Sequence, residues 1–386
     1  MDTVKYSKML SDKYIVNLKK MSYKYSDDFD EFINTLKEIE YNHIPINDFE
    51  GQKVCYLKFA NTVNLKTVKL LCQSQSSRYG NASLENEILA TSSIENIDFK
   101  RDSVRNIIKG MYPSDEQEKR ILGLKLGFEF ISDKANKINE ENLYKLYQMS
   151  IGKFLDDGDK LQEGNYYRHS SVYVVGDGVE HTGIDYKKLN SYMDDLIRFI
   201  NLDDDVNDLT KAAIIHFYIG YLHPYFDGNG RISRLIHLWY LIQQGYDTAL
   251  FIPFSKLIKQ NKNKYYNAYT QVEDNKKYSN VIDVTPFILF FNEYVYDVLA
   301  TESDTTNDTL NKYKNALNKG LITPKEDNLW HFILSNYSDC EFTSKRLEKD
   351  FGNVAYATVY KFLNKFTELE LLSSKKMSNK ILYSIK

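Results

Sequence analysis

Apolar residues recur at helical spacing over two stretches in the middle of the chain. From residue 209 to 222 they stand three or four positions apart, and the same spacing returns from 232 to 242. Pro224 cannot continue a helix, because proline has no N–H and its ring clashes with the preceding turn, so the first helix ends near His223. Gly245 suits the C-terminal cap of the second helix. The pattern predicts a helix, a short loop and a helix.

The same periodicity organises the N-terminal part of the chain less evenly. Residues 87–97 form one predicted helix, with Ile88, Thr91 and Ile94 or Glu95 along one side. Residues 1–80 show patchy helical spacing, for example at Phe29, and are expected to form an N-terminal helical region. The polar run 301–308 has no apolar stripe, so residues 301–324 are expected to be a linker or exposed loop.

Two segments depart from the simple helical pattern. Residues 171–175 and 179–181 are β-rich and flank Gly-Asp-Gly, which predicts a hairpin in an otherwise mainly α chain. From about 325 to 386, three helical stretches precede two short strands, with Thr343 as the cap of the second helix. Three helices and a hairpin resemble a winged-helix domain.

Composition and charge indicate a multi-domain globular protein. The chain has 386 residues, of which 42% are apolar and 27% charged. Its three cysteines, Cys55, Cys72 and Cys340, are widely spaced and odd in number, which favours a reducing compartment. The charged start lacks an apolar export segment and no run is long enough to span a membrane, so we expect a cytoplasmic protein. The net charge of −3 argues against a globally basic nucleic-acid binder.

The C-terminal segment has a charge of the opposite sign. Residues 329–386 hold nine Lys and Arg residues against six Asp and Glu residues, a net charge of +3. Lys361 and Lys365 lie on the predicted third helix, and three lysines fall in the expected wing. DNA contact is one interpretation. Packing on the rest of the protein, assembly or target recruitment is the other, and the modest charge favours it.

The candidate chemistry lies in the loop between the two central helices, His-Pro-Tyr-Phe-Asp-Gly-Asn-Gly-Arg-Ile-Ser-Arg at residues 223–234. Its two glycines let successive N–H groups point at one spot, just where the helix dipole is positive, which makes an anion site. Asp227 offers an oxygen ligand suited to Mg²⁺, and Arg231 and Arg234 offer planar donors for phosphate oxygens. Arginine is scarce in the chain as a whole, at nine residues against forty-one lysines, so two arginines in this loop point to a need for the planar guanidinium.

Each part of this loop alone has a more ordinary interpretation. Asp-Gly-Asn-Gly is usually a turn, and a lone His before Pro is usually a cap or surface residue. The usual phosphate loop, Gly-x-x-x-x-Gly-Lys-Ser/Thr, is absent. In combination, the residues favour a phosphate and metal site with a base, His223, at its edge.

The 223–234 loop resembles the signature of the Fic family of protein AMP-transferases. The resemblance implies that His223 is the general base, that ATP is the substrate, and that Asp227 holds Mg²⁺. It assigns nucleotide binding to Asp227, Gly228, Asn229, Gly230, Arg231 and Arg234, with Arg234 on the γ-phosphate. Tyr225 is a departure, since the family usually has Phe there, and its hydroxyl needs a partner or water.

A second segment is similar to the inhibitory motif of this family. Thr91-Ser-Ser-Ile-Glu95-Asn96 matches Ser/Thr, three variable residues, Glu, then Gly or Asn, within an inhibitory helix at about 85–97. If Glu95 pairs with Arg234, the guanidinium is withheld from the γ-phosphate. The alternative for this motif is a helix end with a solvent-facing Glu. Glu95 also leaves the direction open, because it could instead activate water to remove AMP from a modified protein.

The resemblance covers about residues 81–300, which we expect to be a Fic domain. It identifies the hairpin as the flap that docks a target segment by strand addition, through Val172, Tyr173, Val174 and Val175. Tyr265 and Tyr266 resemble a tyrosine pair near the adenine. The expected partners are an unidentified target protein and the chain itself, and a homodimer stays open. A DNA-binding regulator whose Fic core senses nucleotide is the competing function class.

Overall fold

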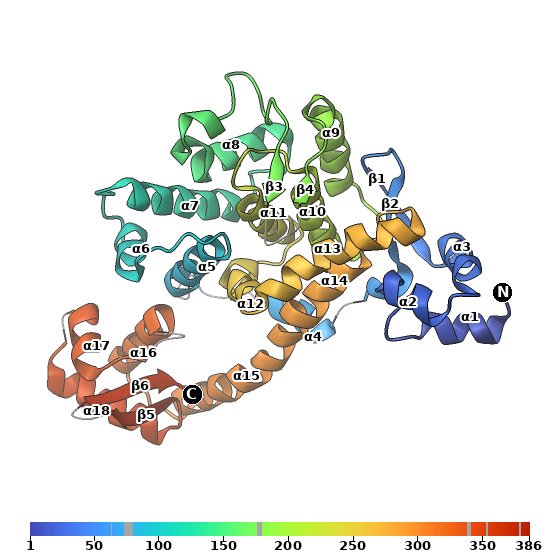
Figure 1. Cartoon of the computed structure of the whole chain (residues 1–386). Coiled ribbons are helices and arrows are strands. Elements are labelled where there is room, and N and C mark those ends of the chain that lie inside the picture. Colours follow the sequence, from blue (N-terminus) through green and yellow to red (C-terminus); the bar gives the residue numbers. More distant parts are fainter. Residues whose placement is uncertain (63, 73–79, 176–179, 338–340, 353, 378–379) are drawn as a thin grey trace.

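The computed structural model describes residues 1–62, 64–72, 80–175, 180–337, 341–352, 354–377 and 380–386 (Figure 1). The fold is mainly helical, as the sequence predicts, with three small two-stranded hairpins among the described residues. The helices up to the flap are α1 (Thr3–Leu10), α2 (Leu18–Lys24), α3 (Phe29–Ile39), α4 (Leu65–Leu71), α5 (Gly80–Ile94), α6 (Arg101–Ile108), α7 (Glu116–Ser132) and α8 (Glu140–Ser150). The later ones are α9 (Leu189–Ile200), α10 (Asp208–Leu222), α11 (Asn229–Gln243), α12 (Phe254–Gln260), α13 (Lys262–Ser279), α14 (Thr285–Phe291) and α15 (Asp297–Asn318).

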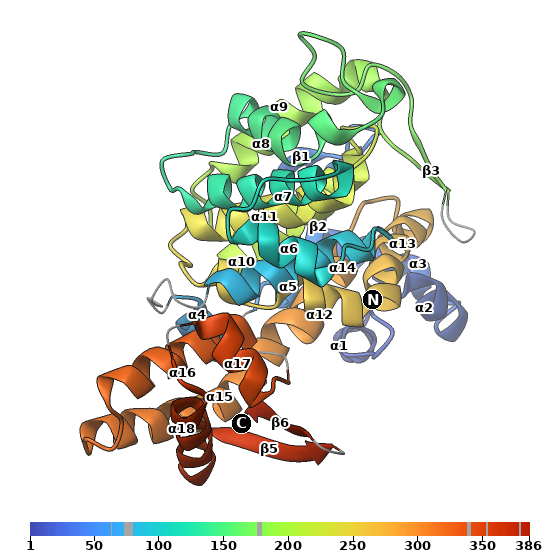
Figure 2. The same cartoon turned by 90° about the vertical axis from the view of Figure 1, so that its left-hand side faces the viewer.

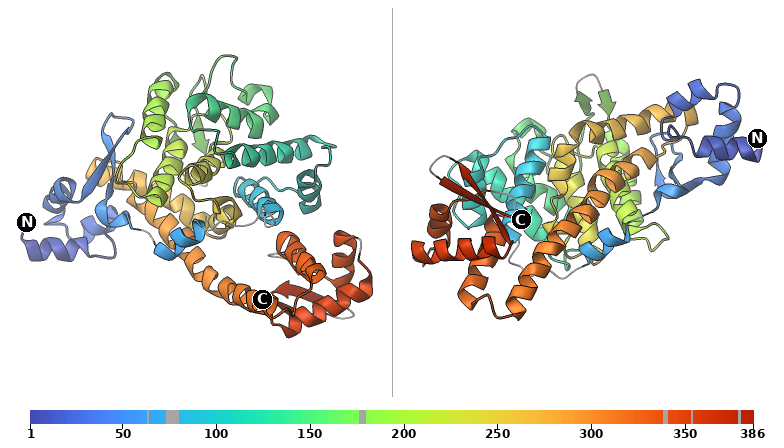
Figure 3. Two further views of the ribbon diagram at one scale, coloured as in Figure 1. Left: turned by 180° about the vertical axis from the view of Figure 1, so that it is seen from behind. Right: turned by 90° about the horizontal axis from the view of Figure 1, so that it is seen from below.

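The centre of the molecule is the antiparallel pair α10 and α11. Every residue of α10 except Asp208 and Gly220 is buried, since α9, α11 and α14 pack around it. Helix α7 covers α11 on the other side and α8 packs on α7 (Figures 1 and 3). The loop that joins α10 to α11 is thereby held at one end of a rigid core.

The expectation of a purely helical N-terminal region is wrong for residues 41–57. Strands β1 (Tyr41–Asn47) and β2 (Lys53–Leu57) form an antiparallel hairpin, with Tyr41 opposite Leu57 and a bulge between His43 and Asn47. The physical reason is a local period of two, because Ile44 and Ile46 are buried on either side of Pro45, which cannot sit in a helix interior. The main chain of Cys55 also bonds to the segment before α14.

The structure corrects a second expectation, that of an irregular loop at residues 301–308. Helix α15 runs through them as far as Asn318, and it leads from the core to the C-terminal region (Figures 1 and 3). Polar residues have modest helix propensities, but this run contains neither Gly nor Pro. Buried Leu299 before it and Tyr313 after it anchor the helix at both ends.

The C-terminal region contains the elements that the sequence predicts. Helices α16 (Pro324–Tyr337), α17 (Ser344–Phe351) and α18 (Tyr356–Glu368) precede the hairpin of β5 (Leu372–Met377) and β6 (Lys380–Ile385). Thr343 caps α17 by accepting the N–H of Arg346. The region has its own core around Trp330 and Phe366. Lys375 and Lys376 lie on β5 of this hairpin.

The C-terminal region rests on the segment that the sequence identifies as inhibitory. Helix α16 packs against α5, and both views place the C-terminal helices beside α5 and α6 (Figures 1 and 2). None of the described helices is long and apolar enough to cross a membrane.

Candidate active site

The loop after α10 begins with a residue in a conformation that non-glycine residues rarely adopt. His223 caps α10 at a φ of 54°, and its N–H donates to the carbonyl of Ile219 at 3.0 Å. The guanidinium of Arg168 fixes this turn by donating to the carbonyls of His223 (2.7 Å), Ser170 (2.7 Å) and Ile184. Arg168 is almost fully buried. We did not single it out in the sequence, although the scarcity of arginine was a signal.

The imidazole of His223 is prepared to accept a proton. Its Nδ1 lies 3.4 Å from the carbonyl of Gly220, which can only accept, so Nδ1 carries the hydrogen and the Nε2 lone pair is available. Burial, with the positive His181 and Arg168 nearby, lowers the pKa of His223 to about 4. The ring is therefore neutral at physiological pH.

An anion site follows at the N-terminus of α11. Gly228 precedes the helix at a φ of 86°, and a Cβ there would meet Ile151 at 2.7 Å. Among the described contacts, none engages the backbone N–H of Asn229, Gly230 or Arg231. Three free N–H groups at the positive end of a helix favour a phosphate or carboxylate.

Two further residues of the loop shape it from within. The side chain of Asn229 accepts the N–H of Tyr225 at 3.0 Å and donates to its carbonyl at 2.8 Å, so its amide braces the loop. The ring of Tyr225 stacks on Tyr147 with centroids 3.7 Å apart. Its hydroxyl is buried and has no hydrogen-bond partner among the described residues. The partner that this hydroxyl requires, where the family usually has Phe, is therefore not supplied by those residues.

Asp227 is the candidate metal ligand. Its carboxylate accepts the N–H of Gly228 at 2.6 Å and one guanidinium N–H of Arg231 at 2.9 Å, while its side chain stays 55% exposed. The described residues contain no group of three His, Cys, Asp or Glu that could hold a metal ion. One exposed carboxylate suits a cation such as Mg²⁺ that is held jointly by the protein and by phosphates.

Arg234 is fully buried and bonded to the distant α5. Its guanidinium donates to the carboxylate of Glu95 at 2.7 Å, to the hydroxyl of Thr91 at 2.7 Å and to the carbonyl of Thr91 at 3.0 Å. The exposed fraction is 1% for the Arg234 side chain and 30% for Glu95. One guanidinium nitrogen, Nη1, is buried without a described partner. The structure thus brings together two motifs that lie more than a hundred residues apart.

The carboxylate of Glu95 lies on the anion site itself. A Cβ at Gly230 would meet the Oε1 of Glu95 and would stand 3.0 Å from its Cδ. Glu95 and Asn96 follow the end of α5 in a turn, with Asn96 at a φ of 60° and its side chain bonded to Lys262 at 3.0 Å. A negative group of the protein therefore occupies the first turn of α11, where a phosphate would bind.

Comparison with known proteins agrees with this geometry. Residues 137–241 match the model of the Fic/DOC family. The chain carries a Fic domain. It is 28% identical over 205 residues to the protein adenylyltransferase Fic of Drosophila yakuba, and 27% identical over 205 residues to that of Drosophila ananassae. In each case the match covers 52% of this chain and 35% of the relative.

A solved structure shows the same fold. The crystal structure of a Fic family protein from Desulfovibrio desulfuricans G20 superposes with a TM-score of 0.52, at 19% identity, over 84% of this chain and 97% of that one. The family resemblance of the 223–234 loop is confirmed. This chain spans about a third of the length of the Drosophila relatives that it matches, at 35%.

The other predicted site residues lie around this centre of the Fic domain. Tyr265 on α13 is buried, and its hydroxyl is 2.8 Å from a ring nitrogen of His216. Tyr266 is 41% exposed, and burial followed by the charge of Glu95 raises its pKa. Tyr266 is thus the member of the pair that is accessible to the adenine ring of a nucleotide.

The flap is a short antiparallel hairpin. Strand β3 (Tyr173–Val175) pairs with β4 (Glu180–Thr182), with Tyr173 opposite Thr182. Tyr173 is 69% exposed and Val172 is partly buried. The backbone of Val174 and Val175 lies on β3, and the Gly-Asp-Gly turn that we expected lies outside the described residues.

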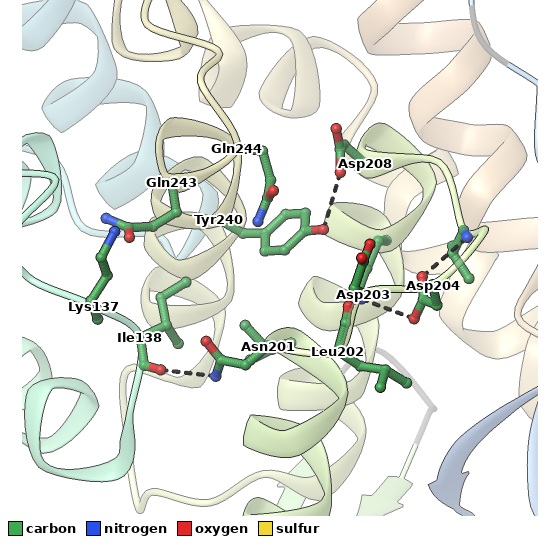
Figure 4. Close-up of a pocket in the computed structure, with 13 residues that line it drawn as sticks. Lys137, Ile138, Asn201, Leu202, Asp203, Asp204, Asp208, Tyr240, Gln243 and Gln244 are labelled. Atoms are coloured by element: carbon green, nitrogen blue, oxygen red, sulfur yellow. Dashed lines mark hydrogen bonds and ion pairs between the residues drawn. The ribbon is translucent and has the colours of Figure 1, made fainter.

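A polar pocket of about 360 Å³ lies at the opposite end of the α10 and α11 pair (Figure 4). Among its lining residues, the hydroxyl of Tyr240 donates to Asp208 at 3.2 Å and Lys211 pairs with Asp204 at 2.9 Å. None of the predicted site residues lines it. The pocket is separate from the candidate active site, where Glu95 fills the space over Gly230.

Proposed function

We propose that this protein transfers AMP from ATP to a hydroxyl of a target protein, or of itself, and that Glu95 holds it inactive. The observation that carries the proposal is the carboxylate of Glu95 on Gly230 and Arg234, a few residues from a neutral, partly buried His223. The names of the Drosophila relatives support the activity. The free thiols Cys55 and Cys72 support a reducing compartment such as the cytoplasm.

The reaction follows from the positions of these groups. A Ser, Thr or Tyr hydroxyl of the target attacks the α-phosphorus of ATP, and the Nε2 of His223 takes its proton. The bond from the α-phosphorus to the bridging oxygen breaks, pyrophosphate leaves, and AMP stays on the target as a phosphodiester. The N–H groups of α11 and the guanidinium of Arg234 hold the phosphates in line. Mg²⁺ on Asp227 would neutralise charge on the phosphates.

Inhibition is a competition for Arg234. While Glu95 is bound, the γ-phosphate has neither the guanidinium nor the space over Gly230, so the α-phosphorus is not aligned for attack. Breaking a buried ion pair typically costs about 3–5 kcal/mol, and less here because Glu95 is partly exposed. The γ-phosphate offers Arg234 a replacement charge, which offsets most of that cost.

Mass spectrometry tests the activity. Glu95→Gly protein is incubated with ATP, Mg²⁺ and a cell lysate, and added AMP is sought on the protein itself and on others. Labelling that disappears in the Glu95→Gly, His223→Ala double variant supports the proposal. No AMP on any protein, with the fold intact by circular dichroism, would refute it.

The partial exposure of Glu95 favours a second candidate reaction. Its carboxylate lies over the anion site and is 30% exposed, so water can reach it beside a bound phosphodiester. Glu95 would then activate that water and the protein would remove AMP from a modified target. Release of AMP from such a target by the wild type, lost in Glu95→Gln, distinguishes removal from addition.

The C-terminal region supports a separate proposal of DNA contact by a winged-helix-like domain. Tyr356, Tyr360 and Lys361 are exposed on α18, and Lys375 and Lys376 are exposed on β5. Lysines and aromatic rings on one element are typical of phosphate and base contacts. Retarded migration of a DNA fragment with the full chain, lost at moderate salt and in Lys375→Glu/Lys376→Glu, would support it. Unaltered migration would favour packing or recruitment.

A further inference from the structure

The ring of His181, on strand β4 of the flap, has an acceptor at each nitrogen. Its Nδ1 lies 2.6 Å from the carboxylate of Glu273 on α13, and its Nε2 lies 2.8 Å from the carbonyl of Tyr221 on α10. A carboxylate and a carbonyl can only accept. Both contacts are hydrogen bonds only if both nitrogens carry a hydrogen, so the geometry selects the imidazolium form.

The surroundings of His181 leave Glu273 as its counterion. The rings of Phe49 and Tyr221 lie 6.3 and 5.8 Å from it, centroid to centroid. The nearby Asp48 and Glu50 are paired with Lys276 at 2.9 and 3.0 Å. Burial, the largest single effect, acts to lower the pKa of His181, and the positive Arg168 does the same. The hydrogen bond and charge of Glu273, together with the hydrogen bond to the carbonyl of Tyr221, outweigh them, so the pKa is raised overall.

This cation lies beside the candidate base. The ring centroids of His181 and His223 are 6.3 Å apart, and the carbonyl that His181 binds is two residues before His223. A positive charge at that distance opposes a second one, so it disfavours a proton on Nε2 of His223. His181 thus links the flap, on which it lies, to the end of α10 and, through Glu273, to α13, the helix that carries Tyr265 and Tyr266.

We propose that His181 is a positioning residue of the AMP-transfer site: as an imidazolium between Glu273 and the carbonyl of Tyr221, it fastens the flap to the end of α10 and keeps His223 neutral. The effect of His181 on AMP transfer rests on the proposed function, but the charge of His181 and its effect on the pKa of His223 do not. Its first effect is electrostatic, on the proton of His223. Its second is geometric, because β4 holds its partner strand β3 in place, so a target segment aligned by the flap stays in register with His223.

Ring-proton NMR titration of the chain's seven histidines measures the electrostatic effect without any activity. We expect the midpoint of His223 to rise by about one pH unit in His181→Gln, from the loss of one charge at this distance. The matched control is His43→Gln, an exposed position on β1, which leaves His223 unchanged. In Glu273→Gln the midpoint of His181 falls, which keeps the test available if His181→Gln does not fold. An unshifted His223 in His181→Gln, or an unshifted His181 in Glu273→Gln, would overturn the proposal.

Kinetics in the Glu95→Gly background then measure the geometric effect. We expect His181→Gln to raise the KM for the target protein several-fold while the KM for ATP stays within about two-fold, because the proposed role of the flap is to align the target. Equal KM values for the target in His181→Gln and His43→Gln would contradict the positioning role. If the Glu95→Gly protein itself transfers no AMP, the proposed function fails, while the NMR result still decides the charge of His181.

Discussion

Two helix ends meet at the candidate active site, and they are built differently. His223 directly follows α10 and Asn96 lies in the turn that follows α5, and both are non-glycine residues with left-handed φ values, 54° and 60°. Three main-chain carbonyls around His223 receive hydrogen bonds from buried Arg168. The end of α5 has local main-chain hydrogen bonds from Glu95 and Asn96 to Ser92 and Ser93. Glu95 and Asn96 reach their distant partners, Arg234 and Lys262, through their side chains.

The difference separates His223, which must stay in place for the reaction, from Glu95, which must move away before it. A base has to remain at hydrogen-bond distance from the attacking hydroxyl, and a clamp on the main chain provides that. An inhibitory carboxylate has to give way to phosphate, and partly exposed side-chain contacts allow it. Arg234, which is buried, stays in place and exchanges one anion for another.

The strongest way to break this comparison is to remove the base itself. In a Glu95→Gly background, His223→Ala is expected to lower AMP transfer by at least about 10²- to 10⁴-fold, the usual contribution of a general base. Transfer of label from α-labelled ATP measures it. Because the side chain of His223 makes one long hydrogen bond, the free energy of unfolding should change little. Undiminished transfer would remove His223 from the mechanism.

Arg168→Lys tests whether the end of α10 depends on its clamp. One ammonium cannot serve three carbonyls in three directions, and each buried carbonyl left without a donor costs roughly 1–3 kcal/mol. We expect the free energy of unfolding to fall by about 3 kcal/mol, measured by urea denaturation, together with a loss of transfer. Wild-type stability in this variant would show that the turn holds itself.

The pH dependence sharpens the account of the base. Protonated His223 cannot accept a proton, so its activity is present above its folded-state pKa and lost as the pH falls through it. Since that pKa is lowered to about 4, kcat/KM for transfer by Glu95→Gly protein should stay level down to about pH 5. A midpoint near 6.5, the ordinary value for histidine, would contradict a desolvated base.

Lys262→Ala probes the weaker end of α5. It removes the bond to the side chain of Asn96 and leaves Glu95 in place, so transfer by the otherwise wild-type protein should rise by less than about three-fold. Surface substitutions of this kind usually change stability by less than about 0.5 kcal/mol. A rise as large as that of Glu95→Gly would mean that Asn96, rather than Glu95, carries the inhibition.

The loop could be predicted because its chemistry is contiguous in the sequence. His223, Asp227 and Arg234 stand on one loop and one helix turn, so their spacing fixes their neighbourhood before any tertiary structure is known. Glu95 was found through the family's motif. Its place over Gly230 required the packing of α5 against α11.

Other contacts around the site come together only through packing. Arg168, the pair of His181 and Glu273, and Phe49 lie in four separate segments, and no local pattern marks them as neighbours. The hairpin β1–β2 was missed because its period-two alternation is short. The prediction of a loop at residues 301–308 is wrong because a polar run without Gly or Pro does not end a helix.

Nucleotide binding tests the central claim most directly. Isothermal titration compares ATP with ADP, which lacks the γ-phosphate, on wild-type and Glu95→Gly protein in the presence of Mg²⁺. If Glu95 and the γ-phosphate compete for Arg234, Glu95→Gly should raise the preference for ATP over ADP by about ten-fold, and Arg234→Ala should abolish that gain. The same ratio of ATP to ADP affinity in both proteins would contradict the account.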